Sequence, residues 1–129
     1  LAGVLKSGSI GEKQNVLSIL GDMKGGVADK LVGDWLAKLR AGEAPRELHL
    51  EIVDSASKRK DASIKAALTA YESTKPADDL TARYRETLYG GDAEHGRKVF
   101  LEKVEAQCLR CHKWQGSGGD VGPSMDGIG

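Results

Sequence analysis

The chain has 129 residues, of which 40% are hydrophobic and 29% are charged, a composition typical of a folded globular protein rather than a disordered one. Nineteen basic residues balance nineteen acidic ones, so no net charge favours nucleic acid or an anionic membrane surface as a partner. No apolar stretch approaches the ~18 residues that a membrane-spanning helix requires.

The first part of the chain follows the spacing of amphipathic helices. Apolar residues recur about one helical turn apart in two stretches: Val27, Leu31, Trp35 and Leu39, widened by Val32 and Leu36, and then Ile64, Ala67, Leu68 and Tyr71. Asp61 stands where an N-cap is expected before the second stretch. We therefore predict an all-α scaffold over residues 1–76, built of HEAT-like stacked helical hairpins, with a plain helical bundle as the alternative.

A connector is expected after this scaffold. Pro76 ends the preceding helix, because the residue before a proline is pushed out of helical geometry. A further helix is predicted over residues 78–89, with Leu80, Tyr84 and Leu88 on one side, and the pair Gly90-Gly91 then breaks the chain. Residues 77–91 should thus connect the scaffold to a second unit over residues 92–129.

The second unit contains the only two cysteines of the chain, in a Cys-Leu-Arg-Cys-His run at residues 108–112. Cys-x-x-Cys-His is the spacing of c-type haem attachment. On one helical turn the thiols of Cys108 and Cys111 share a face, where both can form thioethers to the haem vinyl groups. His112 lies beside them as the proximal iron ligand. The run predicts one covalently attached haem c.

The residues that flank this run carry a family resemblance. Gly-Asp-Ala-x-x-Gly-x-x-x-Phe precedes it at residues 91–100, and Gly-Pro-x-x-x-Gly follows it at residues 122–127. With these flanks, residues 91–129 resemble the first half of a class I cytochrome c. More narrowly, they resemble the haem-binding domain of large multidomain proteins from planctomycetes and verrucomicrobial relatives, in which HEAT-like helices precede this domain.

The resemblance implies roles for four further cofactor-binding residues. The carbonyl of Pro123 would accept a hydrogen bond from the proximal histidine, a type of contact that orients the ligand and tunes the iron. Gly96 and Phe100 would form the contact of the N-terminal helix. Met125 occupies the position of a leucine that packs against the ring edge, so we expect packing rather than iron ligation from it.

The resemblance also implies a function. It is one-electron transfer rather than enzyme catalysis, with a redox partner protein or a dehydrogenase domain of a longer parent protein as donor, in an extracytoplasmic, periplasmic setting. Class I cytochromes carry their distal ligand well downstream of the attachment run, whereas only a short segment follows His112 here. We therefore expect a fragment or subunit of a larger protein. The sixth iron ligand would come from a missing segment or another chain, or the haem would be five-coordinate.

The cysteine pair has two other possible roles, structural zinc binding and thiol redox chemistry. A structural zinc site needs a second pair of ligands, and neither His49 nor His95 has the spacing that a zinc finger requires. Thioredoxin-like redox chemistry needs flanking strands, which the sequence does not predict. The alternative to an electron-transfer protein is a structural helical interaction module whose cysteine pair binds zinc or no metal.

Overall fold

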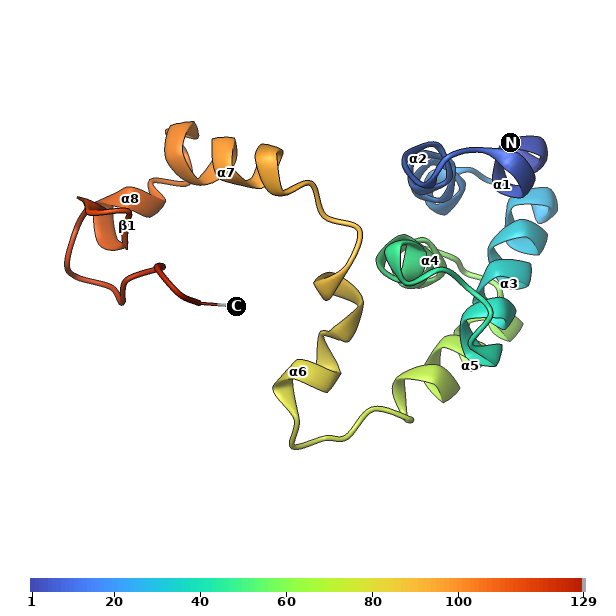
Figure 1. Cartoon of the computed structure of the whole chain (residues 1–129). Coiled ribbons are helices and arrows are strands. Elements are labelled where there is room, and N and C mark those ends of the chain that lie inside the picture. Colours follow the sequence, from blue (N-terminus) through green and yellow to red (C-terminus); the bar gives the residue numbers. More distant parts are fainter. Residues whose placement is uncertain (129) are drawn as a thin grey trace. The chain divides into compact units, whose positions relative to one another are not determined.

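The computed structural model describes residues 1–128, and most of them lie in helices (Figure 1). The predicted all-α class is confirmed, because the one sheet within this range is a hairpin of two-residue strands. The chain divides into two compact units, Leu1–Gly90 and Gly91–Gly129. Among the described residues there is no helix with the length and apolar character needed to cross a membrane.

The helices of the first unit begin and end at local sequence signals. In chain order they are α1 (Ala2–Ser7), α2 (Ile10–Asp22), α3 (Gly26–Ala41), the 3-10 helix η1 (Arg46–Leu48), α4 (His49–Ser57), α5 (Ala62–Glu72), α6 (Leu80–Arg83) and the 3-10 helix η2 (Arg85–Leu88). Ser9 and Glu12 form a capping box at the start of α2. The Asp61 carboxylate accepts hydrogen bonds from two backbone N–H groups of α5, which confirms the predicted N-cap. Gly42 ends α3 in the left-handed conformation, with φ 75°.

The core of the first unit lies among α2, α3, α4 and α5. Helix α2 packs on α4, and α3 packs on both α4 and α5. The largest fully buried apolar side chains are Leu17, Leu20, Val32, Leu36, Leu48 and Ile52. The predicted core positions Trp35, Leu39, Ile64 and Tyr71 are also buried. The predicted helix faces are therefore confirmed over most of their length.

One predicted stripe is rotated from its expected position. Val27 is 76% exposed, whereas Ala28, one residue later, is buried together with Val32 and Leu36. Because α3 is contacted by α2, α4 and α5, its buried arc is centred on the Ala28 side of the helix. Including Val27 in the buried stripe was wrong, since helical spacing alone does not say which neighbours cover each side.

The single helix predicted over residues 78–89 forms instead as two short turns, α6 and η2. Tyr84 between them has φ −112° and ψ 20°, outside the α-helical region, so the residues that follow are rotated about the chain axis. Leu80, Tyr84 and Leu88 are all more than half exposed and form no buried face. Residues 77–90 belong to the first unit rather than to a separate connector.

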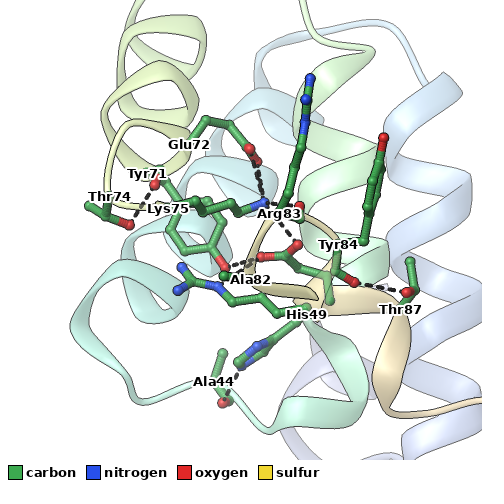
Figure 2. A network of polar contacts seen from close by, with 12 residues as sticks. Ala44, His49, Tyr71, Glu72, Thr74, Lys75, Ala82, Arg83, Tyr84 and Thr87 are labelled. Atoms are coloured by element: carbon green, nitrogen blue, oxygen red, sulfur yellow. Dashed lines mark hydrogen bonds and ion pairs between the residues drawn. The ribbon is translucent and has the colours of Figure 1, made fainter. Parts of the chain in front are cut away.

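A network of polar side chains holds η2 to α5 (Figure 2). Glu86 is 4% exposed and accepts hydrogen bonds from the Tyr71 hydroxyl and from the Lys75 ammonium, the latter at 2.8 Å. Lys75 also pairs with Glu72 at 2.9 Å. Burial alone would raise the pKa of Glu86, but the hydrogen bonds from Lys75 and Tyr71 outweigh it, so this pKa lies below its ordinary value. The carboxylate is thus charged and paired, which is the condition for burying it.

The second unit contains α7 (Ala93–Glu102), α8 (Cys108–Cys111), β1 (Lys113–Trp114) and β2 (Ser117–Gly118). The Asp92 side chain caps α7 by accepting a hydrogen bond from the backbone N–H of His95. The antiparallel strands pair Lys113 with Gly118 and Trp114 with Ser117. None of residues 91–128 is buried. The apolar core of the described chain therefore lies entirely in the first unit.

Candidate functional site

Helix α8 is a single turn that carries both cysteines of the chain. Its start is marked by Gln107, which has a left-handed φ of 47°. Its end is closed by a hydrogen bond of 3.0 Å from the His112 N–H to the Cys108 carbonyl. Both thiols are free, with Cys108 half-buried and Cys111 exposed. Residues three apart on one turn share a helix face, so the two thiols are placed to bind one group together.

The imidazole of His112 is held in one orientation. Its Nδ1 lies 2.9 Å from the carbonyl oxygen of Pro123. Because a carbonyl oxygen only accepts hydrogen bonds, Nδ1 carries the proton and donates it. The lone pair of Nε2 is then available to a metal, and the hydrogen bond at Nδ1 makes the ring a stronger ligand.

Residues 118–125 form a loop that is tied to α8 and to the first residue after His112. The Gly119 N–H donates to the Leu109 carbonyl at 2.9 Å, and the Gly122 N–H donates to the Cys111 carbonyl at 2.6 Å. Farther along, the Met125 N–H donates to the Lys113 carbonyl at 2.8 Å. These backbone bonds hold Pro123 in place beside the imidazole.

Gly122 lets the loop come this close to the imidazole. A Cβ atom at Gly122 would lie 2.7 Å from two atoms of the His112 ring, closer than carbon atoms tolerate. Gly118 has φ 116°, and a Cβ there would collide with the His112 carbonyl oxygen. Sequence reasoning did not assign either glycine to the site. The signal that could have found them is their position between His112 and Pro123, where a short loop must turn back onto the ring.

Three of the predicted cofactor-binding residues gather elsewhere in the unit. Gly96, Phe100 and Met125 line one open hollow of about 610 Å³, together with Ala93, Arg97, Trp114 and Ile128. A Cβ atom at Gly96 would meet no atom within 4 Å in the described residues. Gly96 therefore lies on an open face of α7, and its conformational freedom is not needed for any close contact in residues 1–128.

Two further interactions order this part of the second unit. The Arg97 guanidinium lies 5.1 Å from the centre of the Trp114 ring, which holds α7 against β1. Lys113 pairs with Asp120 at 2.5 Å across the hairpin. Both contacts are local, and neither encloses the thiols or the imidazole.

The other two histidines of the chain are on α4 and α7, not on α8 with the cysteines. His49 belongs to the first unit, where its Nε2 lies 3.0 Å from the Ala44 carbonyl oxygen. His95 is exposed on α7. Within residues 1–128 no three side chains of the His, Cys, Asp and Glu types gather into a group that could hold a metal ion. The described residues therefore do not supply the four ligands of a structural zinc site.

Comparisons with known proteins add no relative to this description: no family model, no curated protein and no solved structure matches the chain. The chemistry of the site follows from its own residues. These are two free thiols on one helical turn and an imidazole whose Nδ1 is engaged and whose Nε2 is available.

Proposed function

We propose that residues 91–129 form the N-terminal portion of a class I cytochrome c domain, which binds one covalent haem c and transfers single electrons. Cys108 and Cys111 would hold the porphyrin through two thioether bonds. The Nε2 atom of His112 would be the proximal ligand of the iron. When bound, the haem supplies the exchange between ferric and ferrous iron.

One observation carries this proposal: the distance of 2.9 Å between His112 Nδ1 and the Pro123 carbonyl oxygen. A histidine that serves only as a surface residue has no need of a fixed ring. A metal-binding histidine does, because a hydrogen bond at the second nitrogen fixes the tautomer and raises the basicity of the first. The same bond would contribute to setting the reduction potential of the iron.

A haem would also add contacts to the second unit, where none of residues 91–128 is buried. A haem is a large, mostly apolar ring that could supply the missing buried surface.

The first unit would act as a scaffold for this electron-transfer module. The shared core of α2, α3, α4 and α5 supports the proposal that these helices form a HEAT-like scaffold. In this proposal it holds the haem module near its electron donor, either a redox partner protein or a dehydrogenase domain of a longer protein. By the same resemblance, covalent attachment places the protein outside the cytoplasm, in the periplasm.

Expression in the periplasm of a bacterium that carries the c-type maturation proteins tests the attachment. We expect a red protein whose Soret band stays with the polypeptide after acid-acetone extraction, and whose mass exceeds that of the chain by one haem. Changing both Cys108→Ala and Cys111→Ala should abolish the attachment. A colourless wild-type protein, with or without bound zinc, would instead support the structural helical module.

A second variant tests the role of the fixed imidazole. Gly122→Ala places a Cβ atom against the His112 ring, so the hydrogen bond to Pro123 should be lost and the reduction potential should change. Gly91→Ala is the matched control, because a Cβ there meets nothing within 4 Å in residues 1–128. Equal potentials for the two variants would mean that this hydrogen bond does not tune the iron.

A further inference from the structure

The first unit contains an open hollow that plays no part in the proposed haem chemistry. It has a volume of about 350 Å³, within the range of small-molecule sites. Its polar lining consists of Arg46, His49, Tyr71, Arg85 and Tyr89. These residues come from η1, α4, α5, η2 and the end of the first unit, so the tertiary structure alone brings them together.

The charge of this lining is positive. Two arginines line the hollow, and no aspartate or glutamate does. The charge of Arg85 is balanced by Glu86, whose Oε1 lies 3.3 Å from Arg85 Nε. Arg46, by contrast, forms no ion pair within the described part of the chain, so its charge is the unbalanced one. A ligand that neutralises this site is therefore an anion.

Both guanidinium groups are held in place by tyrosines. Arg46 lies 5.3 Å from the centre of the Tyr89 ring and donates a hydrogen bond of 3.1 Å to its hydroxyl. Arg85 lies 5.1 Å from the centre of the Tyr71 ring. Stacking of this kind orders an arginine while leaving most of its five N–H donors unused, and a planar fork of donors matches a carboxylate or a phosphate.

The remaining walls distinguish between these two anions. Leu39, Leu88 and the tyrosine rings make part of the lining apolar. Removing a phosphate dianion from water at such walls costs more free energy than its interaction with one unpaired arginine contributes. A singly charged carboxylate, by contrast, matches the single charge of that arginine. The apolar walls also offer contact area to a hydrocarbon or aromatic group attached to the carboxylate.

We propose that this hollow binds a carboxylate that carries an apolar or aromatic group, with Arg46 as its main anchor. The carboxylate accepts hydrogen bonds from the N–H groups of Arg46, and its apolar body lies against Leu39 and Leu88. The source of this chemistry is either a free organic acid or the C-terminal carboxylate of a peptide that ends in an apolar residue.

Chemical-shift titration of the whole chain tests this proposal. Benzoate is the probe, compared with benzyl alcohol, which has the same body without the charge, and with inorganic phosphate. We expect saturable shifts at the amides of residues 46–49 and 85–89 with benzoate, in the millimolar range or tighter. Equal shifts with benzyl alcohol, or tighter binding of phosphate, would overturn the proposal.

A pair of arginine variants tests the anchor. Arg46→Gln should weaken benzoate binding at least about tenfold, the effect of losing one charge-assisted hydrogen-bonded pair. Arg46 is exposed, so the change leaves the core intact. Arg83→Gln is the matched control, because Arg83 stacks on Tyr84 at 5.9 Å but does not line the hollow. Equal affinities for the two variants would exclude Arg46 as the anchor.

Peptides distinguish the two sources. A short peptide that ends in phenylalanine is titrated with a free and with an amidated C-terminus. Tighter binding of the free peptide than of benzoate assigns the site to a peptide terminus, and tighter binding of benzoate assigns it to a free acid. Binding of the amidated peptide as tightly as the free one would show that the carboxylate is not recognised and would overturn the proposal.

Discussion

Residues 1–90 and residues 91–128 differ in what holds them together. In the first unit, side chains from α2, α3, α4 and α5 are withdrawn from water into one apolar core. In the second unit no residue is buried, and local backbone hydrogen bonds, one hairpin and one stacked pair provide the order. Apolar burial contributes about 25 cal/mol for each Å² removed from water, so among the described residues this contribution is concentrated in the first unit.

This difference explains where the candidate site lies. The proposed attachment residues and the loop that fixes His112 are in the second unit, where a bound group would add buried contacts. The carboxylate hollow is in the unit with a core, where the helices already fix the positions of Arg46 and Arg85. If both proposals hold, one chain carries a site that depends on its ligand for order and a site that is preformed.

The largest expected effect concerns the dependence of the second unit on the proposed haem. In the variant that carries Cys108→Ala and Cys111→Ala, amides of residues 108–125 should exchange with solvent at nearly unprotected rates, whereas attachment should slow them. Amides of α2 and α4 serve as the control within the same sample and should be unchanged. If residues 108–125 remain protected without haem, the second unit folds by itself and the contrast between the units is wrong.

The core of the first unit can be broken by one truncation. Leu36→Ala should lower the free energy of unfolding by about 2–5 kcal/mol, because the Leu36 side chain is fully buried and leaves a cavity. Val27→Ala on the same helix is the control and should cost less than about 0.5 kcal/mol, because Val27 is exposed. Denaturant unfolding measures both. Equal losses in the free energy of unfolding would mean that Val27 is part of the core.

The buried ion pair gives the first unit a dependence on pH. Glu86→Gln should cost about 2 kcal/mol at neutral pH, the usual worth of hydrogen bonds to a buried charge. The pKa of Glu86 is lower in the folded than in the unfolded chain, so its contribution is present above the unfolded value of about 4.3 and is lost as the pH falls through the folded value.

The free energy of unfolding should therefore decrease less steeply with falling pH in Glu86→Gln than in the wild type. Glu72→Gln is the control, since Glu72 pairs with the same Lys75 but its side chain is 43% exposed and should contribute less than about 1 kcal/mol. A pH profile of unfolding that is unchanged by Glu86→Gln would show that this carboxylate does not stabilise the fold.

The smallest expected effect compares two helix caps of the same type. Asp61→Ala removes the cap of α5 and should lower the free energy of unfolding of the first unit by about 1 kcal/mol. Asp92→Ala removes the cap of α7 in the second unit and should leave the first unit unaffected. A loss of stability of the first unit in Asp92→Ala would mean that the two units do not unfold independently.

Several features were predictable because they depend on residues close together in the chain. The helical spacing around Trp35 and Tyr71 and the caps at Asp61 and Asp92 are set by residues within a few positions of each other. Helix geometry is local, so these signals persist whatever the rest of the chain does. The contact between His112 and Pro123 was implied by resemblance alone, and its distance comes from the structure.

Other features could not be found in this way. Helical spacing placed Leu80, Tyr84 and Leu88 on one side of a single helix, yet all three are exposed and the side chain that is buried there is Glu86. The helix breaks at Tyr84. The partners that make burial of a carboxylate acceptable are Tyr71 on α5 and Lys75 in the segment that follows α5. Spacing within one segment contains no information about such partners.

By itself the sequence determined the helical class, most of the helix faces and the placement of both thiols beside His112, because each of these depends on spacing along one segment. The tertiary structure decided which side of α3 is covered, that Glu86 is buried, that Gly122 must lack a side chain, and that Arg46 and Arg85 line one hollow. Each of these depends on distances between segments remote in the chain, which no local pattern encodes.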